Sequence, residues 1–222
     1  MSGKKLLLLN GSPRKKGTSF SFARTIQKLA VESGSTVEIV HIIDYYDGKE
    51  KLDELQRMIV ESDIMGIIAP IYSDTLPFFN IWLLEKLADE RGEILKGKGL
   101  FALGQCGFPD VTRVEPLLNA CEFFAGETGM HWYGGLAYGG GPLINGALLE
   151  DLGKKGEKIT LGLRLALENI IGGEQIPAQS QEILTVKIPK ILNRPLAAFL
   201  NYNTKKLARK NGNADYARKA YL

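Results

Sequence analysis

One stretch near the start of the chain predicts a strand, a polar loop and the beginning of a helix: Lys5-Leu6-Leu7-Leu8-Leu9-Asn10-Gly11-Ser12-Pro13-Arg14-Lys15-Lys16-Gly17-Thr18-Ser19. Its apolar part, residues 5–9, is short and uninterrupted, as in a buried strand. After the loop, one stripe at helical spacing consists of Phe22, Ala23, Ile26, Leu29 and Ala30. Gly34 is a residue type that commonly ends a helix. A buried strand that leads into an amphipathic helix indicates an α/β protein.

The same alternation of strand and helix continues along the chain. Further strands are predicted at residues 36–43, 64–69, 99–103 and 130–138. Helical stripes follow within residues 52–60, 77–87, 114–125 and 159–170. Pro77 opens the third helix, whose apolar positions include Phe78, Ile81, Trp82, Leu84 and Leu87. Five strands alternating with five helices predict a doubly wound, five-stranded parallel sheet, in which ligands bind beyond the carboxyl ends of the strands.

The composition limits the class of protein. The chain has 222 residues, which suits one domain with an appendage, and its 45% hydrophobic and 24% charged residues are ordinary for a soluble globular protein. The two cysteines, Cys106 and Cys121, argue against a disulfide framework and favour a reducing, cytoplasmic location. The first apolar run is too short for a signal peptide, and no run of 18 apolar residues predicts a membrane span.

Regular alternation stops near Gly172. We therefore expect a first domain over residues 1–172 and a partly helical C-terminal extension over residues 173–222. A short amphipathic helix is predicted at residues 196–210 of that extension.

The charge of the chain is concentrated at its end. From Lys187 onward nine Lys or Arg accompany one acid, Asp215, so this segment carries +8; because the whole chain carries +3, the preceding residues carry −5. A solvated helix face is the usual explanation, and a subunit contact or an acidic partner is the alternative. The tail also contains the apolar residues Leu196, Ala197, Phe199, Leu200 and Leu207. We therefore expect residues 196–222 to pack on a neighbouring subunit and to help form the wall of the ligand pocket.

The loop after the first strand has the features of an anion site. A helix N-terminus offers free N–H groups and a positive dipole end. Hydroxyls of Ser12, Thr18 and Ser19 and the guanidinium of Arg14 add donors for a phosphate. The alternative is a simple helix cap, with Thr18 or Ser19 as the N-cap residue.

Two other phosphate-binding motifs are absent from this loop. Five residues separate Gly11 from Gly17, and Thr18 stands where a Walker A loop needs lysine. The dinucleotide fingerprint G-x-G-x-x-G is missing as well. A mononucleotide phosphate fits the loop better than either motif.

Two further loops follow predicted strands. The first reads Pro70-Ile71-Tyr72-Ser73-Asp74-Thr75-Leu76-Pro77 and could place Tyr72 near a flat aromatic ligand, or it is only a stiff turn. The second reads Gly104-Gln105-Cys106-Gly107-Phe108-Pro109-Asp110, and its glycines allow the backbone to approach a ligand. Cys106 has no histidine near it in sequence, which disfavours a catalytic Cys–His pair, and Cys121 lies on a helical stripe as a core residue.

A glycine-rich stretch, residues 134–141, ends the fifth strand. It lines the pocket or merely turns the chain, and the sequence leaves both interpretations open. No group of Cys or His residues has the spacing of metal ligands.

The loops together resemble a known family. Asn10-Gly11-Ser12-Pro13-Arg14 with Gly17-Thr18-Ser19 resembles the phosphate loop of the NADPH-dependent FMN reductase family, and Pro70-x-Tyr72 with Asp74 and Pro77 is similar to its isoalloxazine loop. The stretch from Gly104 to Pro109, the glycine-rich stretch and the end of the chain resemble a subgroup called flavodoxin-family NAD(P)H-dependent oxidoreductases.

The resemblance implies a flavodoxin-like fold with strand order 2-1-3-4-5, FMN as a prosthetic group, and a homodimer or higher homo-oligomer. A related group of iron–sulfur flavoproteins needs a cysteine cluster that this chain lacks. From the loops and the resemblance together, the expected FMN-binding residues are Ser12, Arg14, Thr18, Ser19, Pro70, Ile71, Tyr72, Ser73, Asp74, Thr75, Gly104, Gln105, Cys106, Gly107 and Phe108.

The implied activity is the transfer of hydride from NAD(P)H through bound FMN to a small-molecule acceptor, which is a quinone, a nitro or azo compound, or free flavin. The flavin carries this chemistry, so no catalytic side chain and no metal are assigned. Backbone N–H groups of residues 104–107 are candidate donors to the flavin N1/O2 edge. We expect no nucleic acid partner and no membrane insertion. The alternatives are a flavodoxin-like electron carrier and a non-enzymatic flavin-binding sensor.

Overall fold

Five parallel strands form the central sheet of the computed structural model, which describes residues 3–46, 49–185, 193–210 and 212. The strands are β1 (Lys5–Asn10), β2 (Thr36–His41), β3 (Ile64–Pro70), β4 (Gly99–Cys106) and β5 (His131–Gly139). Their order is β2-β1-β3-β4-β5, and every neighbouring pair is parallel. This order confirms the predicted flavodoxin-like fold.

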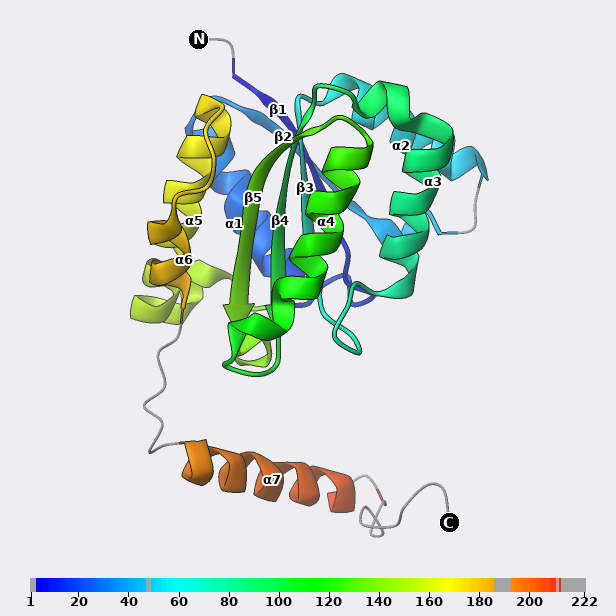
Figure 1. Cartoon of the computed structure of the whole chain (residues 1–222). Coiled ribbons are helices and arrows are strands. Elements are labelled where there is room, and N and C mark those ends of the chain that lie inside the picture. Colours follow the sequence, from blue (N-terminus) through cyan, green and yellow to red (C-terminus); the bar gives the residue numbers. More distant parts are fainter. Residues whose placement is uncertain (1–2, 47–48, 186–192, 211, 213–222) are drawn as a thin grey trace. The chain divides into compact units, whose positions relative to one another are not determined.

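Helices cover both faces of the sheet (Figure 1). On one face lie α1 (Thr18–Glu32) and α5 (Gly153–Gly172), and on the other lie α2 (Lys49–Glu61), α3 (Phe78–Leu95) and α4 (Glu115–Glu127). Successive side chains of a strand point to opposite faces of the sheet, and each face has its own apolar core. Leu6 and Leu8 pack with α1 and α5, whereas Leu7 and Leu9 pack on the opposite side. Because both faces are covered, β3 is buried along its whole length.

Strand ends differ from the sequence prediction. β1, β3 and β4 continue past their last predicted residue to Asn10, Pro70 and Cys106, because the ladder needs backbone groups and not apolar side chains. The prediction that the second strand runs to residue 43 was wrong. β2 ends at His41, and a short 3-10 helix, η1 (Ile42–Asp44), follows with Ile42 buried. Isoleucine favours a strand but also fills a core from a turn, so its propensity does not mark the end of the strand.

The predicted apolar stripe of α3 was only partly right. Leu84 and Leu87 are buried, but the side chains of Phe78 and Ile81 are 63% and 36% exposed. The helix instead buries Phe79, Leu83 and Leu87, which are four residues apart. With apolar residues at both 78 and 79, periodicity alone could not decide which of the two faces the core.

A sixth helix, α6 (Ala178–Leu184), covers the edge of the sheet that β5 forms. Gln181 donates from Nε2 to the carbonyl of Ala137 at 2.9 Å and accepts from the N–H of Ala137 at 2.8 Å. A side-chain amide thus substitutes for a neighbouring strand at an otherwise open edge. Residues 173–185 of the predicted extension therefore belong to a compact unit that spans Met1–Thr185.

The second unit, Val186–Leu222, contains α7 (Asn193–Lys210), which confirms a helix in this part of the extension. Phe199, Tyr202 and Leu207 of α7 are each at least 60% exposed. The helix has no acidic residue. Residues 213–222 of the tail lie outside the described residues.

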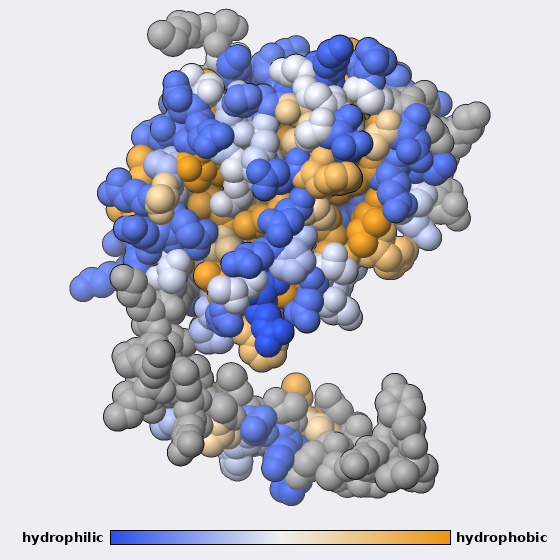
Figure 2. Space-filling model, in the orientation of Figure 1, coloured by the Kyte–Doolittle hydropathy of each residue, from blue (hydrophilic) through white to orange (hydrophobic). Residues whose placement is uncertain are grey.

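The surface in Figure 2 is mainly hydrophilic, with apolar side chains gathered in patches. The large exposed apolar side chains of the first unit include Phe78, Phe123 and Leu143. Within the described residues, no helix is both long and apolar enough to cross a membrane.

Candidate cofactor site

A cavity of about 200 Å³ lies at the carboxyl ends of the strands, where the three predicted loops meet. It is lined by Ser12, Arg14, Gly17, Thr18, Pro70, Ile71, Tyr72, Gln105, Cys106, Gly107, Pro142 and Asn145. Most of the expected cofactor-binding residues are therefore brought together. Gly17, Pro142 and Asn145 are additions that were not among them.

The remaining expected residues lie outside the lining. Ser19 is fully buried in the first turn of α1, and its hydroxyl has no partner among the described residues. Ser73 and Asp74 form an exposed tip with positive φ angles of 51° and 59°, and Thr75 pairs with Tyr72 through backbone hydrogen bonds. The other two are Gly104, whose missing side chain makes room for Val114, and Phe108, which is 66% exposed.

The N-terminus of α1 is open toward this cavity. Gly17 is the N-cap residue and has no side-chain capping bond, so the alternative of a cap by Thr18 or Ser19 was wrong. The Thr18 hydroxyl instead donates to the carbonyl of Gly141 at 2.8 Å. The N–H groups of Thr18, Ser19 and Phe20 have no acceptor within the helix. These groups and the helix dipole favour an anion here.

Buried side chains hold the loop that precedes α1. Asn10, at the end of β1, accepts the N–H of Ser12 at 3.2 Å, and the Ser12 hydroxyl accepts the N–H of Arg14 at 3.2 Å. From α3, Asn80 donates to the carbonyl of Gly11 at 3.0 Å. A Cβ at Gly11 would lie 2.1 Å from Asn80 Oδ1, so glycine is required for this approach. Asn80 was missed by the sequence analysis, although a polar residue in an apolar first turn was a usable signal.

The segment after β5 closes the other side of the cavity. Asn145 has a left-handed φ of 45°, and its Oδ1 accepts from Arg14 Nη2 at 3.2 Å. Gly146 has a φ of 85°, and a Cβ there would lie 2.3 Å from the carbonyl oxygen of Lys16. At Gly141 a Cβ would lie 1.8 Å from the side-chain oxygen of Gln105. Residues 134–141 are not in the lining of the cavity; the segment just after them, residues 142–146, turns the chain and brings Pro142 and Asn145 to the cavity wall.

Cys106 stabilises the third loop. Its thiol donates to the carbonyls of Phe108 at 3.1 Å and Asp110 at 3.5 Å. Burial raises the pKa of the Cys106 thiol, so it remains a protonated donor and not a nucleophile. Because β4 includes residues 104–106 and pairs on both edges, Gly107 is the one residue of the expected donor set that lies beyond the strand. Among the described residues no cluster of metal ligands occurs.

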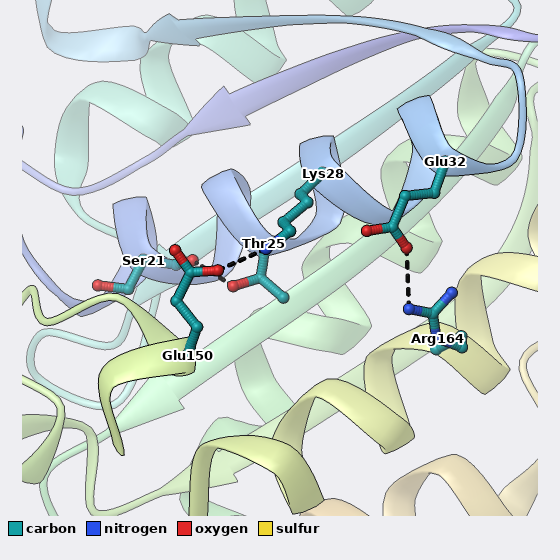
Figure 3. Close-up of polar contacts among 6 residues, drawn as sticks. All are labelled: Ser21, Thr25, Lys28, Glu32, Glu150 and Arg164. Carbon is teal, nitrogen blue, oxygen red and sulfur yellow. Dashed lines mark hydrogen bonds and ion pairs between the residues drawn. The ribbon is translucent and has the colours of Figure 1, made fainter. Parts of the chain in front are cut away.

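A larger cavity of about 520 Å³ lies between α1, α5 and a 3-10 helix, η4 (Leu149–Leu152). Its polar walls already satisfy one another: Lys28 pairs with Glu150, and Arg164 pairs with Glu32 at 2.9 Å (Figure 3). None of the residues that line this cavity belongs to the three predicted loops. We therefore take the smaller cavity as the candidate ligand site.

The smaller cavity fits the phosphate end of FMN. Its lining supplies N–H, hydroxyl and guanidinium donors, and none of its residues carries a carboxylate. Pockets that enclose a whole small ligand usually exceed about 300 Å³. A flavin would therefore have its phosphate and sugar chain held inside, with its ring against the loops that carry Tyr72 and Gly107.

Comparisons with known proteins agree with this geometry. Residues 4–104 match the family model described as NADPH-dependent FMN reductase, which confirms the resemblance over β1 to most of β4. The match ends at Gly104, so residues 105–110 of the third loop and the glycine-rich stretch lie outside it. No curated protein sequence matches the chain.

Two solved structures show the same fold. The Trp repressor binding protein from Bacillus subtilis is 18% identical with a TM-score of 0.54, and the match covers 66% of this chain and 93% of that protein. A flavone reductase is 14% identical with a TM-score of 0.56, and the match covers 77% of this chain and 65% of that protein.

Proposed function

We propose that this chain, whose residues 4–104 match the NADPH-dependent FMN reductase family, is an oxidoreductase that passes hydride from NAD(P)H through bound FMN to a small acceptor. The acceptor class is a quinone, a nitro or azo compound, or free flavin. The observation that carries the proposal is the uncapped N-terminus of α1, which opens into a carboxylate-free cavity lined by all three predicted loops.

The phosphate of FMN would be held by the first turn of α1, by Ser12 and by Arg14. Arg14 is exposed and reaches the cavity with a planar group suited to phosphate. The flavin ring would lie near Ile71, Tyr72 and the N–H of Gly107. When bound, FMN supplies the two-electron chemistry. The protein binds and orients the cofactor, and Gly107 offers a backbone donor to its ring edge.

An exposed edge of the site supports access by both substrates. Tyr72 is 47% exposed and Phe108 is 66% exposed, so the outer side of the cavity is open to solvent. We further propose that the protein acts as a homodimer or higher homo-oligomer in the cytoplasm. Both described cysteines are free thiols, in keeping with a reducing compartment.

Anaerobic reduction tests the proposed activity against the electron-carrier alternative. FMN-loaded protein is mixed with NADH or NADPH, and the loss of the oxidised-flavin absorbance is followed by stopped flow. A reductase is bleached by at least one nicotinamide within seconds and is reoxidised by a quinone. Loaded protein that dithionite bleaches but neither nicotinamide does would contradict the enzyme and favour a carrier or sensor.

A further inference from the structure

Asn10 connects the phosphate-facing loop to the neighbouring strand β2. The residue is completely buried and ends β1 in register with His41. Its Oδ1 accepts the N–H of Ser12 at 3.2 Å, and its Nδ2 lies 2.9 Å from His41 Nδ1. One amide group therefore contacts both the loop and the strand.

These two contacts determine the protonation state of His41. The backbone N–H of Ser12 can only donate, so its partner must be the amide oxygen of Asn10. The amide nitrogen then faces His41, and because it can only donate, Nδ1 must accept. His41 is therefore neutral, with its proton on Nε2. An imidazolium would place an N–H of His41 against the N–H of Asn10 and break the contact.

The surroundings of His41 favour this neutral form. Its ring packs on Phe20 of α1, with centroids 5.4 Å apart. Burial lowers the pKa of His41, and Lys15 lowers it further, whereas Asp44 raises it. Lys15 and Asp44 are paired with each other, and burial remains the largest of these influences on the pKa of His41.

The contacts continue from Asn10 to the cavity. Ser12, which Asn10 holds by its N–H, accepts the N–H of Arg14 through its own hydroxyl. Arg14 and Ser12 both line the cavity. A change at His41 can thus alter the conformation of the phosphate-binding loop without touching the ligand.

We propose that neutral His41 is a positioning residue for this loop, acting through Asn10, and that its protonation weakens the binding of FMN by its phosphate. The part that concerns FMN rests on the proposed function. The part that concerns the loop does not, and the two are tested separately.

Two variants isolate the acceptor. His41→Val removes the ring and the acceptor, whereas His41→Asn removes the ring but places an amide oxygen near the position of Nδ1. Calorimetric titration at pH 7.5 should give His41→Val an FMN affinity roughly tenfold below wild type, because a buried donor loses its partner. Riboflavin binding should be nearly unchanged. His41→Asn should restore most of the FMN affinity. Equal FMN affinity in wild type and His41→Val, or equal losses for FMN and riboflavin, would overturn the proposal.

The pH dependence of FMN binding distinguishes the titration of the His41 imidazole from the titration of the FMN phosphate. A phosphate monoester itself titrates near about pH 6, but this affects every variant alike. We call the chain of hydrogen bonds from His41 through Asn10 to Ser12 the relay. Because the pKa of His41 is lowered from 6.5, the relay is intact above pH 6.5 and is lost as the pH falls through the lowered pKa. Over the pH range in which NMR shows the His41 imidazole to become protonated, wild type should lose more FMN affinity than His41→Asn. Parallel profiles would contradict the pH claim.

A measurement without flavin tests the relay itself. Nitrogen-15 NMR of the imidazole in flavin-free wild-type protein at pH 7.5 should show a protonated Nε2 and an unprotonated Nδ1. The Ser12 N–H should also exchange with solvent faster in His41→Val than in wild type. A protonated Nδ1, or an unchanged Ser12 exchange rate, would overturn the positioning role. If this result is as expected and wild type binds no flavin, the proposed function fails and the loop relay stands.

Discussion

Arg14 donates from its guanidinium Nη2 to Oδ1 of Asn145 at 3.2 Å, across a separation of 131 positions in the chain. The contact joins the loop after the first strand to the segment after the last. It orients the one arginine of the first loop beside the open N-terminus of α1. The proposed phosphate-binding end of the site is therefore assembled from the segments that follow the first and the last strand of the sheet.

Replacing Arg14 should weaken the binding of FMN more than the binding of riboflavin. A hydrogen bond to a charged group contributes roughly 1.5–3 kcal/mol, so Arg14→Ala should lower the FMN affinity about ten- to a hundredfold. Riboflavin, which lacks the phosphate, should bind nearly as before. Flavin fluorescence titration of both ligands measures the difference. Equal losses for the two would mean that Arg14 acts through the fold and not on the phosphate.

Gly146 should be needed for the contact between the two loops. Gly146→Ala forces a side chain into a left-handed conformation and against the carbonyl of Lys16. The matched control is Gly173→Ala, which has the same φ of 85° but no atom within 4 Å of the added Cβ. Urea unfolding should show a loss of about 1 kcal/mol for the control and a larger loss for Gly146→Ala. Only Gly146→Ala should also weaken the binding of FMN. Similar losses of stability and of FMN affinity in the two variants would refute the loop contact.

Cys121 should make the protein less stable in alkali. Burial raises the pKa of its thiol from 9.0 to about 12. The contribution of the buried Cys121 thiol to stability is present below pH 9 and is lost as the pH rises toward 12. Between these values the thiol ionises only in the unfolded chain. The free energy of unfolding of wild type should therefore fall more steeply above pH 9 than that of Cys121→Ala. Cys106 is present in both proteins, so its ionisation affects the two slopes equally. Identical slopes would contradict the buried, protonated thiol.

The alternation of strands and helices and the position of the site could be predicted because they depend on local signals, whereas the strand order 2-1-3-4-5 came from the resemblance to the FMN reductase family. Apolar or β-branched runs marked the strands, and the loops after β1, β3 and β4 marked the site. The ends of β1, β3 and β4 could not be read in this way, since Asn10 and Cys106 continue the ladder with side chains that carry no strand signal.

The missed residues depend on contacts between distant segments. Asn145 and Pro142 reach the cavity only because the glycine-rich segment folds back on the first loop, and no local pattern encodes that approach. The same holds for Gln181, which seals β5 from 44 positions away. A hydrogen bond made by an isolated amide has no periodicity in the sequence.

The basic tail should act at a subunit contact. All residues that line the described cavity lie in the first unit, so deleting residues 187–222 should leave part of the FMN binding intact, with a flavin more exposed to solvent. Sedimentation velocity should show a smaller oligomer than the full chain, because the deletion removes the exposed apolar residues Phe199, Tyr202 and Leu207 together with the +8 segment. An unchanged oligomer would leave the tail as a site for another partner.

The most direct test of the central claim is the identity of the cofactor. Natively purified protein, or protein reconstituted with a mixture of FMN and FAD and then desalted, is denatured, and the released chromophore is identified by mass spectrometry. The open N-terminus of α1 and the small cavity predict FMN at one equivalent per chain, with the oxidised-flavin bands in the visible spectrum before release. Recovery of FAD without FMN, or of no flavin from either preparation, would contradict the account.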